Sequence, residues 1–167
     1  MTRRDLWTMW LAIVGALVPI LACAAQQRET EHPRNVGQRI EIDAPTYWFY
    51  EAMGMLQGVQ TVNGRVEGTF TERQRATRFA VPADQVRDPA ARTAGYKQAV
   101  ARIIGYMRPG AVPDTESNRQ YLRELQTKLK AMTGLDFATY DEWKQWFDAN
   151  REKLKWSDEK KVFVVEG

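Results

Sequence analysis

The pattern of hydrophobic and polar positions divides the chain into an apolar N-terminal segment, a polar linker and a longer amphipathic region. Residues 6–25 carry no charged side chain, residues 26–44 are mostly polar, and residues 45–167 mix apolar with charged positions. Twenty apolar residues in a helix span about 30 Å, the thickness of the hydrocarbon core of a membrane. We therefore predict a membrane anchor or signal segment (1–25), a polar linker (26–44) and one folded domain (45–167).

The first half of the predicted domain combines one helix with weaker β patterns. Alternating residues 39–43 favour an edge strand, and residues 46–56 favour a helix with Asp43 or Thr46 near its start. Asn63-Gly64 is a strong turn sequence between two short β-prone runs, so a short hairpin is expected there. The arginine-rich stretch 71–87 contains Pro82 and is predicted to be a surface connection.

The second half has clear helical periodicity. Asp88 precedes Pro89 as an N-cap, and apolar residues recur at helical spacing as far as residue 107. A second helix is predicted over residues 117–132. A third begins at Thr139, which can form a capping box with Glu142.

These elements set the expected fold class. The three C-terminal helices should form the core, in which Leu125, Trp143 and Trp146 are buried. The charged run 151–161 is predicted to be a solvated helix end, and residues 162–165 a short strand or a partner-docking tail. The chain is thus expected to be mainly α: an N-terminal transmembrane or signal helix, followed by a small helical domain that allows a short β-hairpin.

The N-terminal segment has three alternative fates. Arg3 and Arg4 precede it, which places the N-terminus in the cytoplasm and the domain outside. Trp7 and Trp10 near its cytoplasmic end favour an uncleaved single-pass anchor in the inner membrane, because tryptophans concentrate at membrane interfaces. Residues 20–23 resemble the lipobox of bacterial lipoproteins, which makes Cys23 a candidate lipidation site and a lipid-anchored periplasmic protein the alternative. The small residues 22–25 also allow cleavage as an ordinary secretory signal.

Composition narrows the possible chemistry. The chain has one cysteine and one histidine, which excludes an intramolecular disulfide and a zinc site built from Cys and His ligands. Glycines do not form a phosphate-binding motif, and we expect neither a cofactor nor a metal. The net charge of +3 comes from basic residues that alternate with acidic ones, so nucleic acid is not an expected partner.

Residues 125–150 resemble the closing segment of bacterial HEAT-type helical-repeat proteins. The resemblance rests on residues 132–137, which read Met-Thr-Gly-Leu-Asp-Phe, and on the aromatic helix that carries Trp143, Trp146 and Phe147. In that family a short aromatic helix caps the last repeat. No repeat of similar period occurs upstream, so the resemblance implies a binding or packing module and brings no catalytic residues with it.

A run of aromatic residues marks the expected contact surface. Tyr47, Trp48, Phe49 and Tyr50 are consecutive, so they surround a helix and one apolar stripe cannot bury them all. Some of them must face lipid headgroups, a partner or another part of the domain. The linker keeps them about twenty residues from the hydrophobic segment and therefore near the bilayer. We predict that these four residues, together with Trp7 and Trp10, contact a partner protein or membrane lipids.

The same observations favour a non-catalytic function. Adjacent carboxylates such as Asp141 and Glu142 point to different helix faces, so no catalytic residue is assigned and an enzyme is the less favoured class. Export, membrane attachment and many aromatics fit an accessory or scaffolding subunit of a larger membrane complex, such as a respiratory or photosynthetic electron-transfer complex. The alternative is a periplasmic lipoprotein that binds a peptide or an envelope component.

The fate of the N-terminal segment can be measured by intact mass. We expect the mature chain to keep the segment as an anchor and so to contain Arg3, or to start at an acylated Cys23. A mature chain that starts at Ala25 or Gln26 without lipid would contradict both forms of membrane attachment.

Overall fold

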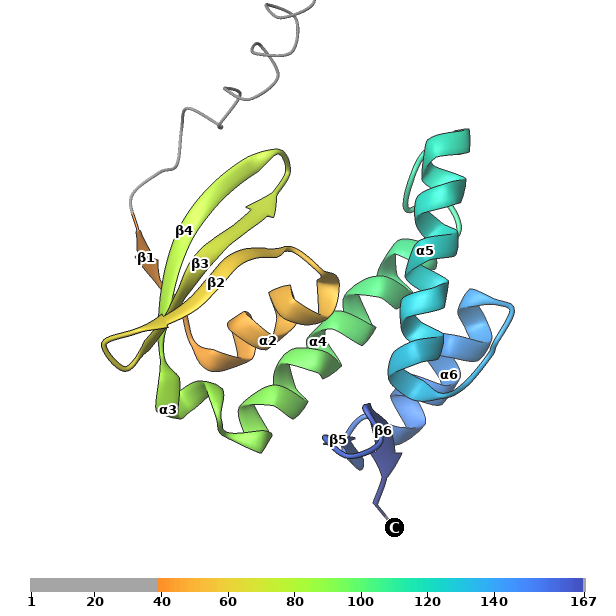
Figure 1. Ribbon diagram of the computed structural model, residues 1–167. Coiled ribbons are helices and arrows are strands. Elements are labelled where there is room, and N and C mark those ends of the chain that lie inside the picture. The colour runs from red at the N-terminus through yellow and green to blue at the C-terminus, as the bar shows by residue number, and fades with distance from the viewer. Residues whose placement is uncertain (1–38, 167) are drawn as a thin grey trace, which may run out of the picture. The chain divides into compact units, whose positions relative to one another are not determined.

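A computed structural model describes residues 39–166 of the chain (Figure 1). These residues are 48% helical and 26% strand, and they form a four-stranded mixed sheet and a two-stranded sheet together with five helices. The prediction of a mainly α fold is therefore wrong: the described residues form a mixed α/β fold.

The N-terminal part of the prediction lies outside the described residues. The segment 1–25, with Trp7, Trp10 and Cys23, and the linker up to residue 38 belong to this part. Within residues 39–166, no helix is both long and apolar enough to cross a membrane. Membrane attachment by the N-terminal segment stays a prediction.

The larger sheet has the strand order β1-β4-β3-β2. β1 (Ile40–Glu41) is parallel to β4 (Arg75–Pro82), whereas β3 (Arg65–Glu72) is antiparallel to both β4 and β2 (Leu56–Val62). The predicted edge strand and the predicted hairpin are confirmed by β1 and by the β2–β3 pair. Asn63 and Gly64 make the turn of that hairpin with φ angles of 49° and 73°, as a two-residue turn between twisted strands requires.

The predicted surface connection over residues 71–87 is wrong. This stretch contains the end of β3, all of β4 and the short helix α3 (Ala83–Val86). β4 lies inside the sheet, where Phe79 and Val81 are 1% and 0% exposed. Hydrophobic burial of these side chains outweighs the polar character of the flanking arginines.

The first helix, α2 (Ala44–Met53), packs on one face of this sheet. The Asp43 carboxylate accepts a hydrogen bond of 2.9 Å from the Thr46 amide, and Gly54 ends the helix with a left-handed φ of 71°, so the predicted helix and its Asp43 cap are confirmed. Beneath α2, the sheet and helix share one hydrophobic cluster, which contains Ala44, Tyr47, Val66, Phe70, Phe79 and Val81.

The predicted C-terminal helices are confirmed as α4 (Pro89–Met107), α5 (Glu116–Thr133) and α6 (Tyr140–Asn150). Asp88 caps α4, and Thr139 with Glu142 forms the expected capping box of α6. Leu125 and Trp143 are buried in the core, as predicted, whereas Trp146 is only partly buried at its edge.

A second hairpin closes this helical core. β5 (Leu154–Ser157) and β6 (Val162–Val165) pair antiparallel, and Leu154 and Phe163 enter the core. The run 151–161 is therefore not a solvated helix end, and for residues 162–165 the short-strand alternative is the one observed. The Trp156 amide donates a hydrogen bond of 3.2 Å to the Thr93 hydroxyl, which ties β5 to α4.

The sheet and the helical core meet where α4 crosses α2. Gly95 lies at the crossing, and a Cβ atom there would be only 2.3 Å from the Pro45 carbonyl oxygen and 2.8 Å from the Phe49 amide nitrogen. The buried Ala91 and Ala99 lie one turn away on either side of Gly95. Small side chains along this stripe allow the two backbones to touch, and α2 is held between the sheet and α4 (Figure 1).

Two glycine substitutions in the same helix test this crossing. Gly95→Ala should lower the free energy of unfolding by about 1–3 kcal/mol, because the added methyl group forces α2 and α4 apart. Gly105→Ala should raise it by about 0.5–1 kcal/mol, because a Cβ there meets no atom within 4 Å and alanine favours the helix. Urea denaturation of both variants gives the two values. If both substitutions stabilised the protein, the close crossing would be wrong.

Candidate functional site

The predicted aromatic contact run lies in α2 between the sheet and α4. Tyr47 is buried at 8% exposure, and Trp48, Phe49 and Tyr50 are partly buried. One stripe cannot bury four consecutive aromatics, but α2 is covered on two sides. Contact with a partner through the surface that these residues leave exposed stays a prediction.

Trp48 connects the two hydrophobic clusters of the domain. It packs against the helical core and against the cluster beneath α2. Its indole N–H donates a hydrogen bond of 3.0 Å to the Val86 carbonyl, and the Arg92 guanidinium lies 3.9 Å from the centre of its ring system. These contacts give Trp48 a structural role inside the domain.

Tyr50 connects α2 with the hairpin formed by β3 and β4. Its ring stacks on Phe70, with ring centres 4.0 Å apart and an angle of 12° between the planes. Its hydroxyl donates a hydrogen bond of 3.3 Å to Glu72. Burial, followed by the nearby Glu72 charge, raises the pKa of the Tyr50 phenol, so Tyr50 remains a neutral donor at physiological pH.

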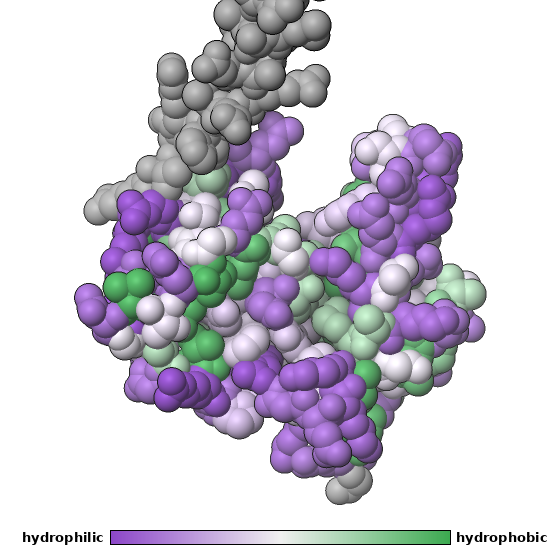
Figure 2. All heavy atoms as spheres, in the orientation of Figure 1, coloured by the Kyte–Doolittle hydropathy of each residue, from purple (hydrophilic) through white to green (hydrophobic). Residues whose placement is uncertain are grey.

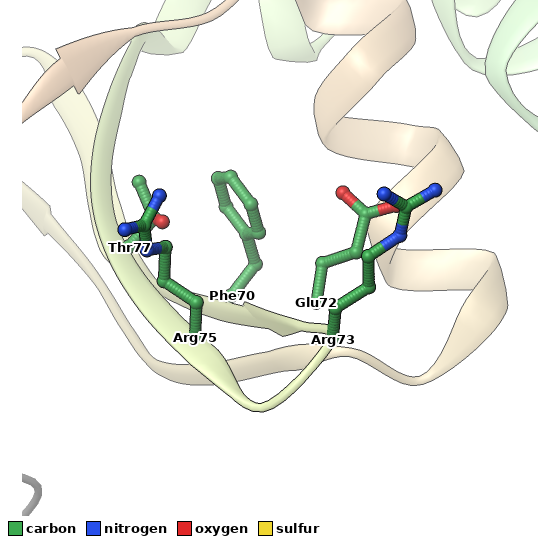
Figure 3. Close-up of a pocket in the computed structure, with 5 residues that line it drawn as sticks. All are labelled: Phe70, Glu72, Arg73, Arg75 and Thr77. Atoms are coloured by element: carbon green, nitrogen blue, oxygen red, sulfur yellow. The ribbon is translucent and has the colours of Figure 1, made fainter.

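A cleft of about 650 Å³ opens beside this stacked pair, and we call it the hairpin cleft. Its lining residues are Phe70, Glu72, Arg73, Arg75 and Thr77, which come from the end of β3, the turn and the start of β4. Figure 3 shows Phe70 between Arg75 and Thr77 on one side and Glu72 and Arg73 on the other. In the space-filling view, the end of this hairpin and α5 rise on either side of a hollow (Figure 2).

The charges around the hairpin cleft are unequally paired. Glu72 receives the Tyr50 hydrogen bond and lies 3.8 Å from the Arg102 guanidinium of α4. Arg102 is itself held by a hydrogen bond of 2.9 Å from its Nε to the Tyr106 hydroxyl. Arg73 and Arg75 are exposed and take part in none of the ion pairs formed among residues 39–166.

The turn that carries the arginines has an unusual backbone. Arg73 and Gln74 both have positive φ angles, 49° and 65°. The left-handed region costs a residue with a Cβ atom about 1–2 kcal/mol, and the other hairpin of this sheet places Asn-Gly in the corresponding positions. The Arg-Gln turn places Arg73 and Arg75 on opposite sides of Phe70 (Figure 3). Unlike Asn-Gly, this pair of residues is not a sequence that indicates a turn.

The exposed edge of β2 is a second candidate surface. β2 pairs with β3 alone among the described strands, and its sequence Leu-Gln-Gly-Val-Gln-Thr-Val has no charge and no proline. Val59 and Val62 are 43% and 36% exposed. Figure 2 shows hydrophobic side chains over this part of the sheet, bordered by hydrophilic ones. Edge strands usually carry lysine or proline that blocks pairing with another chain, and here the protection is limited to a bulge between Gln57 and Gln60.

The described residues supply no metal-binding cluster. Over residues 39–166, no group of three or more His, Cys, Asp or Glu side chains is placed to hold a metal ion. The hairpin cleft offers arginine and threonine donors beside a single carboxylate, which suits binding of an anion better than acid–base chemistry. The cleft was not predicted from the sequence, because its arginines are scattered in a stretch interpreted as a surface connection.

Comparison of the chain with family models, with curated proteins and with solved structures finds no match. None of these comparisons bears on the resemblance of residues 125–150 to HEAT-type proteins, which stays a prediction.

Replacing Trp48 tests its structural role. Trp48→Ala should cost about 3–5 kcal/mol of unfolding free energy, because it empties space between two clusters and leaves the Val86 carbonyl without its indole donor. Trp146→Ala, at the partly exposed edge of the helical core, should cost less. Thermal or urea denaturation of both variants shows which substitution lowers the stability more. A fully stable Trp48→Ala protein that has lost a binding partner would instead support a purely interfacial Trp48.

Proposed function

We propose that this protein is a non-catalytic, membrane-attached accessory subunit of a larger membrane protein complex, with residues 39–166 on the periplasmic side. The N-terminal hydrophobic segment supplies the attachment, as an anchor or through a lipid on Cys23. A respiratory or photosynthetic electron-transfer complex is the assembly that we propose for it.

The uncharged edge of β2 is the observation that carries this proposal. A strand that exposes its backbone edge, two valines and no charge can add one strand of a partner protein by main-chain hydrogen bonding. Such pairing needs no catalytic group and no cofactor, and the sheet of the partner would continue through β2, β3 and β4. We therefore assign β2 as the docking edge.

The second candidate is a lipid-anchored periplasmic protein that binds an extended peptide. The same docking edge favours it, because β-addition accepts a free peptide as readily as a strand of a folded subunit. The two candidates differ in the identity of the partner, which is an integral membrane subunit in the first and a free extended peptide in the second.

Photo-crosslinking in native membranes tests the docking edge. A photoreactive amino acid at Val59 of the full chain should form crosslinks to a subunit of a membrane complex, since this side chain lies on the exposed strand. The same amino acid at Gln98, on the exposed face of α4, is the control and should give none to that subunit.

A charged residue on the docking edge of β2 should weaken binding of the partner. Val59→Lys should reduce the recovered partner at least about tenfold, because lysine on an edge strand opposes pairing and is costly to bury. Gln98→Lys adds the same charge elsewhere and should leave recovery unchanged. Normal recovery with Val59→Lys, together with equal crosslinking from both positions, would contradict docking through β2.

A further inference from the structure

We propose that the turn between β3 and β4 contacts anionic lipid headgroups of the membrane to which the chain is attached. We call residues 73–75 the basic turn. This contact rests on the proposed membrane attachment, and it adds to docking through β2 a second interaction, which is made by side chains and not by a backbone edge. Its partner is a lipid surface that contains phosphatidylglycerol or another anionic phospholipid.

The end of the β3–β4 hairpin carries an excess of positive charge. Arg73, Arg75 and Arg78 are exposed, and none of them takes part in an ion pair within the described part of the chain. Glu72, at the end of β3, lies 3.8 Å from the Arg102 guanidinium, which balances its charge. Three guanidinium groups therefore remain at this end of the sheet without a counterion among the described residues.

The arrangement of these arginines suits an extended surface and not a single small anion. Arg73 and Arg75 lie on opposite sides of Phe70 (Figure 3), whereas a membrane offers many phosphates in one plane, so each guanidinium can bind a different one. Arg78 is three residues beyond Arg75 on β4, which is about 10 Å along the strand. Its charge thus stays within about one Debye length of a surface that touches the turn.

The composition of the turn limits the contact to the headgroups. Residues 72–75 read Glu-Arg-Gln-Arg and include no apolar side chain. Phe70 beneath them is only 6% exposed and stacks on Tyr50. Burial among acyl chains needs an exposed apolar or aromatic side chain, so the contact is electrostatic. An arginine near an anionic membrane surface then favours the docked state about fivefold.

The direction of β1 brings the linker into the domain at the same end of the sheet. β1 is parallel to β4, with Ile40 beside Phe79, so both strands start toward the basic turn (Figure 1). The uncharged Asn63-Gly64 turn lies at the opposite end. Residues 26–38 span at most about 45 Å even when fully extended. A membrane-attached chain therefore holds the domain close to the bilayer, where weak headgroup contacts become effective.

Paramagnetic relaxation from labelled lipids tests the contact. The full chain is placed in nanodiscs that carry a nitroxide on the lipid headgroup, made either from phosphatidylcholine alone or from equal parts of phosphatidylcholine and phosphatidylglycerol. In the anionic discs, the Gln74 amide should show a larger relaxation enhancement than the Gly64 amide at the other end of the sheet. The difference should decrease in phosphatidylcholine discs and at high salt, because both remove the electrostatic attraction.

Arginine substitutions identify the charges responsible. Arg73→Gln and Arg75→Gln should each lower the ratio of docked to undocked domain about fivefold in the anionic discs. Arg87→Gln is the matched control, because Arg87 is exposed and follows α3. The first amide of α3, that of Ala83, donates to the Gly64 carbonyl at the opposite end of the sheet. Arg87→Gln removes the same charge and should leave the docking ratio unchanged.

Two results would overturn the lipid contact: an enhancement at Gln74 no larger than at Gly64 in the anionic discs, or equal losses for Arg75→Gln and Arg87→Gln. The first would instead favour an acidic partner protein as the counterion of the arginines. A chain that does not remain with the discs would contradict membrane attachment itself. A chain that remains with them without contact at Gln74 would contradict the basic turn alone and leave crosslinking at Val59 unaffected.

Discussion

The close crossing of α2 and α4 is the contact on which the domain depends. At Gly95 the backbones of the two helices touch, and a methyl group there would overlap the Pro45 carbonyl. This approach allows α2 to be covered by the sheet on one side and by α4 on the other. Trp48 lies at the crossing and belongs to both hydrophobic clusters, so the sheet and the helical core are parts of one packed structure.

The crossing also sets the position of the candidate sites. α2 carries Tyr50, whose ring stacks on Phe70 and so fixes the floor of the hairpin cleft. α4 carries Arg102, which reaches Glu72 at the rim. The β3–β4 hairpin is thus held from two helices, and its turn projects Arg73 and Arg75 from a supported base. β2 packs on the far side of β3, where its outer edge stays open.

The helices and turns that could be predicted from sequence are those whose capping or turn residues lie next to them in the sequence. α4 and α6 begin at Asp88 and Thr139, whose side chains cap the helices as their sequence context indicates. Asn63-Gly64 likewise marks its own turn. In these places neighbouring residues alone contain the information that determines the structure.

The elements that were missed depend on tertiary contacts. β4 starts after an Arg-Gln turn and with arginines among its first residues, so its strand character rests on Phe79 and Val81 being buried under α2. β5 was not predicted, because it lies in a charged run. Its strand conformation depends on Leu154 and Trp156 packing against the helical core. The hairpin cleft was missed for the same reason, since its residues come together only once β4 is recognised as the partner of β3.

We infer that the sheet and the helical core are stabilised as one unit through the α2–α4 crossing. Native-state hydrogen exchange of the full chain measures this directly, by comparing the slowest amides of β4 with those of α4 and α6. The account predicts that Ala80, Ile103 and Trp143 exchange with the same free energy, equal to that of global unfolding. Amides of β4 that stayed protected by about 2 kcal/mol more than those of α6 would show two independent cores and contradict it.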